Sequence, residues 1–246
     1  MNESNAPTVV ACFGTSTTAG KGQAFNWIGE LEKRPENAKF RFYNFGVGGD
    51  LSYNVLARLS SVVACHPDRV IVLVGGNDVL ATVFKKIREL ISGWKKLPHA
   101  PSPRWFRENL QTIVQRLKKE TSARIALISI QQIGEDSKST NPAQHELNVL
   151  IEQYNGVIKE IAQAESVDYI PLYERLHEQI EVSPRRAFTA FRFLPFYRDT
   201  FRYCILRESS DEIAKKNGWQ FHVDGIHLNK RGGMILAELV QKFLDS

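Results

Sequence analysis

The sequence predicts an α/β protein, a three-layer α/β/α sandwich in which helices cover both faces of a parallel sheet. Five short apolar runs are predicted strands, at residues 8–13, 40–47, 69–74, 124–130 and 167–172. Unbroken runs of Val, Ile and Leu are typical of strands that are covered on both faces. Helix-like segments separate these runs, and such alternation indicates right-handed βαβ units.

Four segments show the apolar spacing of amphipathic helices, at residues 51–64, 105–120, 143–164 and 231–244. In the second, Phe106, Leu110, Ile113 and Leu117 recur at intervals that place them on one face. No repeat or low-complexity linker interrupts the pattern, and a chain of 246 residues can bury one large core. We therefore predict a single domain over residues 1–246, with insertions at about 79–103 and 180–219.

The composition is that of an ordinary globular protein. The formal net charge of +5 is a mild excess, because 27 acidic residues offset 32 basic ones, and no nucleic-acid-binding motif accompanies it. Cys12, Cys65 and Cys204 are few and widely spaced, which argues against a disulfide framework and a Cys-based zinc site. With no signal-peptide pattern and no apolar span of about 20 residues, we expect a cytoplasmic protein.

Three glycine-containing turns follow predicted strands, and a polar motif precedes the last predicted helix. The turns are Gly14-Thr15-Ser16, Gly46–Asp50 and Gly75–Asp78, and the motif is Asp224–His227. Glycine permits a positive φ and lets backbone N–H groups approach a ligand. Ligands of open α/β sheets bind at the carboxyl ends of the strands, so we expect these groups to meet there.

The residue types in these turns are those that acyl transfer requires. A serine hydroxyl is a weak nucleophile until an imidazole accepts its proton, and a carboxylate holds that imidazole in the correct tautomer. Ser16, His227 and Asp224 are candidates for these three roles. The backbone N–H groups of Ser16 and Gly49 and the side-chain amide of Asn77 are candidates to stabilise the oxyanion.

The segments FGTSTTAG, NFGVGGD, VGGND and DGIHLN resemble the sequence blocks of the SGNH/GDSL hydrolase family, in the order of that family. The resemblance implies a flavodoxin-like five-stranded sheet, Ser16 as nucleophile, Gly49 and Asn77 as oxyanion donors, and His227 as base with Asp224 three residues before it. One position departs from the pattern, since Thr15 stands where the family usually has Asp. That Asp is not the triad acid, so we expect activity to survive.

Other interpretations of these motifs fit less well. GTSTTAGK is not a P-loop, because five residues separate Gly14 from Gly20 and Gly22 follows Lys21 where a Ser or Thr is needed. His222, Asp224 and His227 are close enough in sequence to bind zinc in principle. We expect His222 to line the edge of the site or to be solvated, and we expect no metal and no cofactor.

The second insertion is rich in arginine and aromatic residues between 185 and 203. It is consistent with a helical hairpin packed on the core, with a lid that lines an acyl pocket, or with a surface that binds anionic lipid. The basic amphipathic segment 85–96 is placed to act with it. Phe191 and Phe196 from this insertion, together with Thr15, Asp50 and Asp78, are predicted to contact substrate.

The predicted function is a serine esterase that hydrolyses carboxylic esters through an acyl-enzyme, acting on lipid-like or short acyl esters. Two alternatives stay open: a carbohydrate acetylesterase, and a non-catalytic binding protein of the same fold with a membrane-surface or ligand role. The expected partner is a small ester, with peripheral membrane contact through residues 180–219 as a further option and no nucleic acid.

Overall fold

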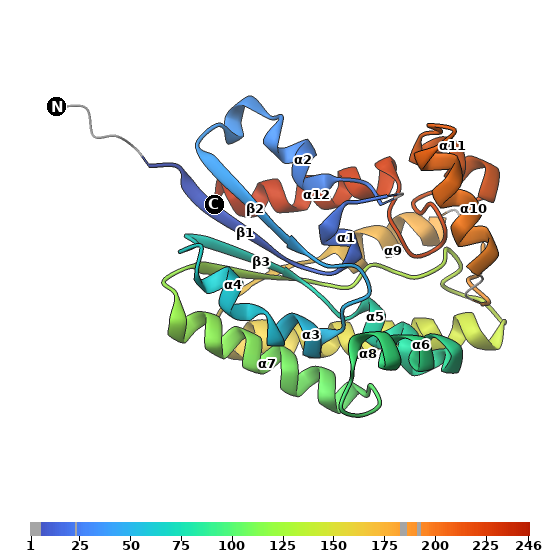
Figure 1. The fold of residues 1–246 in the computed structure, drawn as a ribbon, viewed down its shortest axis with the longest axis horizontal. Coiled ribbons are helices and arrows are strands. Elements are labelled where there is room, and N and C mark those ends of the chain that lie inside the picture. The colour runs from blue at the N-terminus through green and yellow to red at the C-terminus, as the bar shows by residue number, and fades with distance from the viewer. Residues whose placement is uncertain (1–5, 23, 183–185, 191–192) are drawn as a thin grey trace.

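A parallel sheet of five strands lies at the centre of the computed structural model, which describes residues 6–22, 24–182, 186–190 and 193–246, with backbone alone at 193–196. Its strands are β1 (Thr8–Gly14), β2 (Phe40–Gly46), β3 (Arg69–Leu73), β4 (Arg124–Ile128) and β5 (Asp168–Ile170). They pair in the order β2-β1-β3-β4-β5, and each pair is parallel. This arrangement confirms the predicted fold class (Figure 1).

The last two strands are shorter than predicted. β4 ends at Ile128, although apolar residues continue to Ile130. The reason lies in the side chain of Asn155, which accepts a hydrogen bond from the Ile130 N–H at 2.7 Å and donates one to the Ile130 carbonyl at 3.0 Å. These backbone groups are therefore satisfied by a helix side chain instead of by the sheet.

Helices cover both faces of the sheet (Figure 1). One layer holds α2 (Trp27–Glu32), α9 (Leu172–Val182) and α12 (Lys230–Asp245). The other holds α3 (Ser52–Ala57), α4 (Leu59–Val63), α5 (Gly76–Val83), α6 (Lys85–Lys95), α7 (Pro103–Glu120) and α8 (Pro142–Ala164). Along β1, Ala11 and Phe13 join the core of this second layer, while Val10 and Cys12 join the first, as the period of two in a strand requires.

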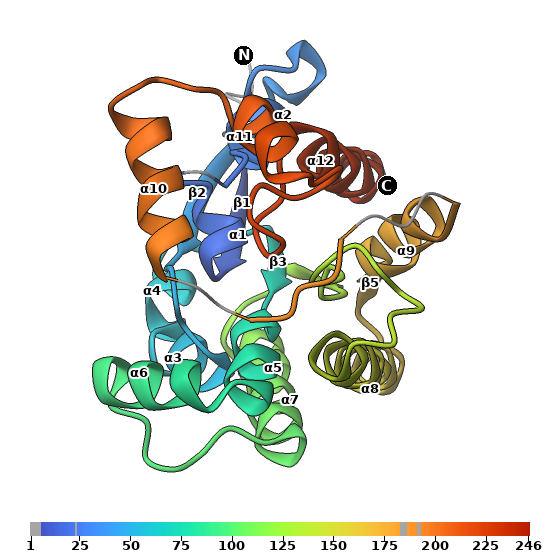
Figure 2. The same ribbon diagram turned by 90° about the vertical axis from the view of Figure 1, so that its right-hand side faces the viewer.

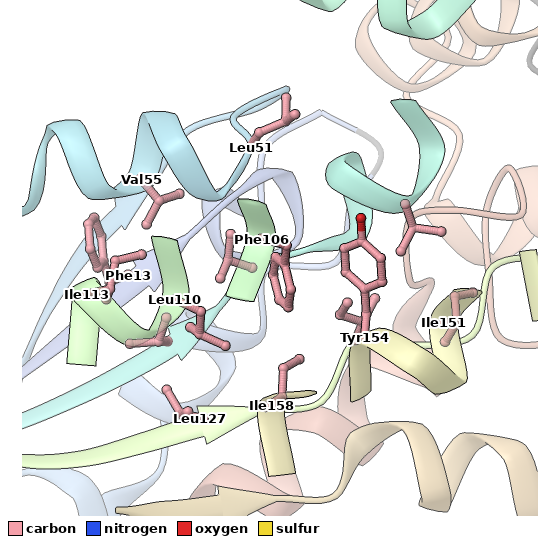
Figure 3. Packing of buried hydrophobic residues seen from close by; sticks show 14 of the residues in the cluster. Phe13, Leu51, Val55, Phe106, Leu110, Ile113, Leu127, Ile151, Tyr154 and Ile158 are labelled. Atoms are coloured by element: carbon pink, nitrogen blue, oxygen red, sulfur yellow. The ribbon is translucent and has the colours of Figure 1, made fainter. Parts of the chain in front are cut away.

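The larger core packs tightly between the sheet and the second helix layer. Phe106 is fully buried, and its ring centroid lies 4.6 Å from that of Tyr154 on α8. Figure 3 shows both rings among aliphatic side chains from α3, α7 and α8. This packing fixes the sheet edge on which the glycine-containing turns lie.

The predicted helix 51–64 is divided into α3 and α4 at Arg58, whose backbone leaves the helical region at φ −107° and ψ 15°. Its guanidinium group points to the sheet edge, where it donates hydrogen bonds to the carbonyl groups of Phe45 and Gly14, both at 2.6 Å. The kink therefore places a cation beneath the turns that follow β1 and β2.

Both predicted insertions contain helices at the carboxyl edge of the sheet. Figure 2 views this edge, with α1 (Ser16–Ala19) near the middle and with α6, α10 (Phe193–Cys204) and α11 (Ser210–Asn217) around it. In α10, Arg198 and Arg202 both form ion pairs with Asp199. This single carboxylate offsets part of their positive charge within the protein. Within the described residues, no helix combines the length and apolar character that crossing a membrane demands.

Phe106→Ala tests the core. The substitution removes a fully buried ring and is expected to lower the free energy of unfolding by about 3–5 kcal/mol. Urea denaturation followed by circular dichroism measures this loss. Val149→Ala on the exposed side of α8 is the control, and it should change stability by less than about 0.5 kcal/mol. A similar small loss in both variants would contradict the packing described here.

Candidate active site

Ser16 stands at the junction of β1 and α1, directly above the sheet edge. A methyl group on Gly14 would lie 2.4 Å from the Leu73 carbonyl oxygen and 2.2 Å from the Thr18 hydroxyl oxygen, so glycine is required for the strand to pass there. The chain then turns at Thr15 and enters α1 at Ser16. This turn leaves the Ser16 hydroxyl partly exposed at the edge.

Three side chains that the sequence analysis singled out meet in one hydrogen-bonded chain. His227 Nε2 lies 3.1 Å from Ser16 Oγ, and His227 Nδ1 lies 2.8 Å from Asp224 Oδ2. The other carboxylate oxygen of Asp224 accepts hydrogen bonds from the backbone N–H groups of Ile226 and His227, at 2.9 and 2.8 Å. Both oxygens of Asp224 are thus used to orient the imidazole.

Asp224 and His227 shift each other's pKa so that both favour their charged forms. Burial raises the pKa of Asp224, but His227 and the backbone N–H groups outweigh it and hold that pKa well below its usual range. Burial likewise lowers the pKa of His227, and the Asp224 carboxylate reverses this and raises it. The arrangement therefore favours an imidazolium once a proton reaches His227.

The segment that carries Asp224 and His227 is a closed loop. The Val223 N–H donates to the His227 carbonyl at 2.8 Å, and His222 forms an antiparallel bridge with Leu228. Gly225 within the loop has a φ of +88°, a conformation that favours glycine. Asp224 and His227 are held at a fixed separation by this closure.

Gly49 and Asn77 lie beside Ser16 on two neighbouring turns. Gly49 has a φ of +74°, and the Asn77 side-chain amide donates to the Asp50 carbonyl at 2.8 Å. An amide nitrogen carries two hydrogens, so one remains after this bond. Asn77 and Ser16 both line the same pocket. The Asn77 bond to Asp50 fixes the turn of Gly49 relative to Asn77.

Asp50 was predicted to contact substrate, but its side chain is engaged within the protein. Its carboxylate oxygens accept hydrogen bonds from Arg58 Nε at 2.7 Å and Lys95 Nζ at 2.8 Å. Lys95 also donates to the Gly48 carbonyl at 3.0 Å. Arg58 and Lys95 did not emerge from the sequence, although Arg58 falls on the apolar stripe of its predicted helix, where a buried cation signals an internal partner.

Asp78, the second predicted contact, is likewise turned inward. Ser52 donates to its carboxylate through the hydroxyl at 2.6 Å and through the backbone N–H at 3.0 Å. Burial raises the pKa of Asp78 to about 7, although the hydrogen bonds from Ser52 oppose this change. Its place is beneath Asn77, where it joins α5 to the start of α3.

A small pocket with mixed polar and apolar walls opens next to Ser16. Its volume is about 20 Å³, and its walls are Thr15, Ser16, Thr17, Leu73, Val74, Gly76, Asn77, Ile130, Gln131, Ile133 and Ile226. Thr15 thus lines the pocket, and its contact with substrate stays a prediction. The predictions for Phe191 and Phe196 fall on side chains outside the described residues.

His222 differs from its expected position at a solvated edge, because it is fully buried. Its ring contacts Glu135 and the Gln132 carbonyl instead of solvent. Across the described ranges, no group of three or more His, Cys, Asp or Glu side chains is placed to hold a metal ion.

The family of the chain is decided by a match over most of its length. Residues 12–233 match the model of the GDSL-like lipase/acylhydrolase family. The chain belongs to this family. Membership confirms the family predicted from the four sequence blocks and makes this GDSL-type chain a carboxylic ester hydrolase.

Solved structures show the same fold. An acetylxylan esterase from Geobacillus stearothermophilus is 17% identical with a TM-score of 0.65, covering 97% of this GDSL-type chain and 95% of its own. The acetyl xylan esterase AlAXEase is 19% identical with a TM-score of 0.62, and the shares are 96% and 99%. An α/β hydrolase from the metagenome of Lake Arreo, Spain, is 16% identical with a TM-score of 0.66, and the shares are 96% and 94%. No curated protein sequence matches the chain.

The raised pKa of Asp78 in this GDSL-type fold predicts a pH-dependent stability. Between the ordinary pKa of an unfolded Asp, about 3.9, and the folded value of about 7, the folded chain retains a proton that the unfolded chain releases. Stability should therefore fall as the pH rises through this window, with a limiting slope of about 1.4 kcal/mol per pH unit. Asp78→Asn removes this contribution.

Urea denaturation of the wild type and Asp78→Asn at pH 5, 6, 7 and 8 measures the effect. The stability of the variant relative to the wild type should rise with pH. The exposed residue Asp211 provides the control, because Asp211→Asn should run parallel to the wild type. A parallel curve for Asp78→Asn would show that Asp78 ionises normally.

Proposed function

We propose that the chain is a serine esterase that hydrolyses short acyl esters through an acyl-enzyme, with Ser16 as nucleophile, His227 as base and Asp224 as triad acid. The observation that carries the proposal is the continuous hydrogen-bonded chain from Asp224 through His227 to Ser16. A non-catalytic binding protein would have no need of an imidazole held between a buried carboxylate and a serine hydroxyl.

The geometry supports a two-step reaction. His227 takes the proton of the Ser16 hydroxyl as Ser16 Oγ attacks the ester carbonyl, and Asp224 stabilises the resulting imidazolium. The backbone N–H groups of Ser16 and Gly49 and the Asn77 amide donate to the oxyanion. His227 then gives its proton to the leaving alcohol, and in the second step it accepts a proton from the water that attacks the acyl-enzyme.

The pocket beside Ser16 favours a short acyl group. Its volume of about 20 Å³ is little more than a single water molecule needs, which suits an acetyl methyl group, and Leu73, Ile130 and Ile226 offer that group apolar contacts. A long fatty acyl chain would extend past its mouth. The pocket therefore supports acetyl or short acyl esters over the lipid-like esters that the sequence analysis also considered.

A specific observation favours an acetylated sugar as the second candidate substrate. The Trp94 ring packs against Gly49, since a methyl group on Gly49 would lie 2.6 Å from the ring, and 64% of Trp94 is exposed. Lys95 Nζ lies 4.1 Å from the ring centroid and steadies it. Neither Gly49 nor Trp94 lines the acyl pocket, so the ring is available to the alcohol part of the ester. The flat C–H face of a pyranose suits such a ring, and two of the matched solved structures are acetylxylan esterases.

The first test is a series of p-nitrophenyl esters from acetyl to palmitoyl with the wild type and Ser16→Ala. The wild type should turn over acetyl and other short esters fastest, and Ser16→Ala should be inactive. The exposed serine Ser60 provides the control, because Ser60→Ala should keep wild-type rates. Full activity in Ser16→Ala would disprove the mechanism, and a preference for palmitoyl would disprove the acyl assignment.

Asn77→Ala tests the oxyanion site. Loss of one such donor is expected to lower kcat by roughly a hundredfold or more, about 3–4 kcal/mol, because the donor acts in the transition state. Asn37→Ala is a matched control, since the Asn37 amide donates to the Leu31 carbonyl and to Gln241, on the helix layer of α2 and α12. An unchanged kcat in Asn77→Ala, with folding intact, would remove Asn77 from the mechanism.

Trp94→Ala separates the two classes of acetyl ester. The variant should lose about tenfold in kcat/KM on tetra-O-acetyl-xylopyranose, mainly through KM, because stacking binds ground state and transition state alike. Ethyl acetate, which has no ring, should be hydrolysed at the wild-type rate. An equal loss of kcat/KM on both esters would mean that Trp94 supports the turn of Gly49 and does not bind a sugar.

A further inference from the structure

The buried contacts of His222 reveal a second pair of acidic and basic side chains behind the triad. His222 is fully buried, and Glu135, in the segment between β4 and α8, is 1% exposed. His222 Nδ1 lies 2.9 Å from Glu135 Oε1, and His222 Nε2 lies 2.8 Å from the carbonyl oxygen of Gln132. Neither residue lines the acyl pocket, and neither takes part in the reaction steps above.

The hydrogen-bond partners determine the charge of His222. A neutral imidazole has one donor and one acceptor nitrogen, whereas only the doubly protonated ring donates from both. The Gln132 carbonyl oxygen can only accept. His222 must therefore either be an imidazolium or receive a proton from a neutral Glu135.

The surroundings of Glu135 exclude the neutral acid. Its Oε1 accepts hydrogen bonds from the backbone N–H groups of Phe221 at 2.7 Å and His222 at 3.0 Å, and its Oε2 accepts one from the Gln220 N–H at 2.7 Å. Oε1 is the oxygen that faces His222 Nδ1, and the two N–H bonds that it accepts occupy both of its lone pairs, so it has no position for a proton to donate to the ring. Burial raises the pKa of Glu135, but the contacts with His222 and these N–H groups outweigh it and lower that pKa.

We infer that Glu135 and His222 form a buried carboxylate–imidazolium pair that positions the loop of Asp224 and His227. Three consecutive N–H groups and one imidazole of the segment before the loop all converge on the single carboxylate of Glu135. Glu135 and His222 are positioning residues, since neither touches substrate or a reacting atom.

The path from this pair to the base is short. His222 forms the bridge with Leu228, the residue after His227, and so closes the loop at its base. The same segment as Glu135 holds the loop at two further points, because the Gly134 N–H donates to the Gly225 carbonyl at 2.8 Å and Gln131 Nε2 donates to the Ile226 carbonyl at 3.3 Å. A displacement of His222 would therefore shift His227 against Ser16.

Energetics also point to position as the role of the pair. A buried ion pair adds little net stability compared with apolar side chains of the same volume, because both charges lose their hydration. What the pair does supply is direction, since each hydrogen bond fixes an angle as well as a distance. Trp219 packs edge-on against His222, which leaves the ring little freedom to turn.

Nuclear magnetic resonance tests the charge directly. In the wild type under the conditions of the activity assay, ¹⁵N signals should show both ring nitrogens of His222 protonated, with exchange-protected N–H protons. A neutral tautomer under these conditions would overturn the inference. This measurement does not depend on catalysis, so it stands even if the Ser16→Ala test disproves the proposed function on which the positioning role rests.

Glu135→Gln tests the positioning role. On p-nitrophenyl acetate its kcat should fall tenfold or more while KM stays within about twofold, because misplacing a catalytic group by about 1 Å slows the chemical step and spares the acyl pocket. Glu135→Asp retains the charge and should recover part of this loss. The control is Asn148→Ala, which loses the bonds to the carbonyl groups of Asp136 and Ser137 and the bond that Asn148 accepts from Gln144 at 2.8 Å, none of them to the loop.

The control separates position from general stability. Asn148→Ala should lower the melting temperature while keeping kcat within about twofold of the wild type. A wild-type kcat in Glu135→Gln, or an equal loss of kcat in Asn148→Ala, would overturn the positioning role. If Glu135→Gln fails to fold, the ¹⁵N spectrum of the wild type and the activity of Glu135→Asp decide the question.

Discussion

The guanidinium group of Arg58 is the contact on which the geometry of the site depends. It bonds the carbonyl that ends β1, at Gly14, and a carbonyl near the end of β2, at Phe45, and it also pairs with Asp50. The turn of the nucleophile and the turn of Gly49 are thereby tied to one cation. Pairing between parallel strands sets only how far each strand extends toward this edge. The hydrogen bonds from Arg58 also set the distance between the two turns.

The acid and base reach the site from the opposite end of the chain and have their own support. Asp224 and His227 lie on a loop that closes on itself through Val223 and Leu228, and the β4–α8 segment holds this loop from behind. The two halves of the site meet at the hydrogen bond between His227 Nε2 and Ser16 Oγ at 3.1 Å. Gln131 also links them, because its amide donates to Thr17 Oγ1 at 3.0 Å and to the Ile226 carbonyl at 3.3 Å.

The sequence predicted the local parts of this arrangement better than the long-range ones. Unbroken apolar runs and the glycine-containing turns identified the five strands and brought Ser16, Asn77, Asp224 and His227 to one edge. Strand ends were less accurate, since nothing local to Ile130 shows that Asn155, 25 residues later, would satisfy its backbone.

Ionic partners were the part that the sequence could not provide. Asp50 and Asp78 stand beside the catalytic motifs and were predicted to contact substrate, but cations and hydroxyl groups from other helices occupy them. His222 and Glu135 are 87 residues apart, and neither belongs to a recognisable motif. Charge pairing of this kind depends on tertiary structure, whereas apolar periodicity and turn residues can be recognised within a short stretch of sequence.

The attachment of α6 has a consequence for how such enzymes can be altered. Two adjacent residues of this helix have different roles. Trp94 faces the solvent beside Gly49, whereas Lys95 donates hydrogen bonds to Asp50 and to the Gly48 carbonyl. Exchanging α6 for the corresponding segment of a relative would replace both the exposed Trp94 surface and the cation that holds Asp50. The insertion is therefore not a separable module, and a grafted segment would have to carry its own cation for Asp50.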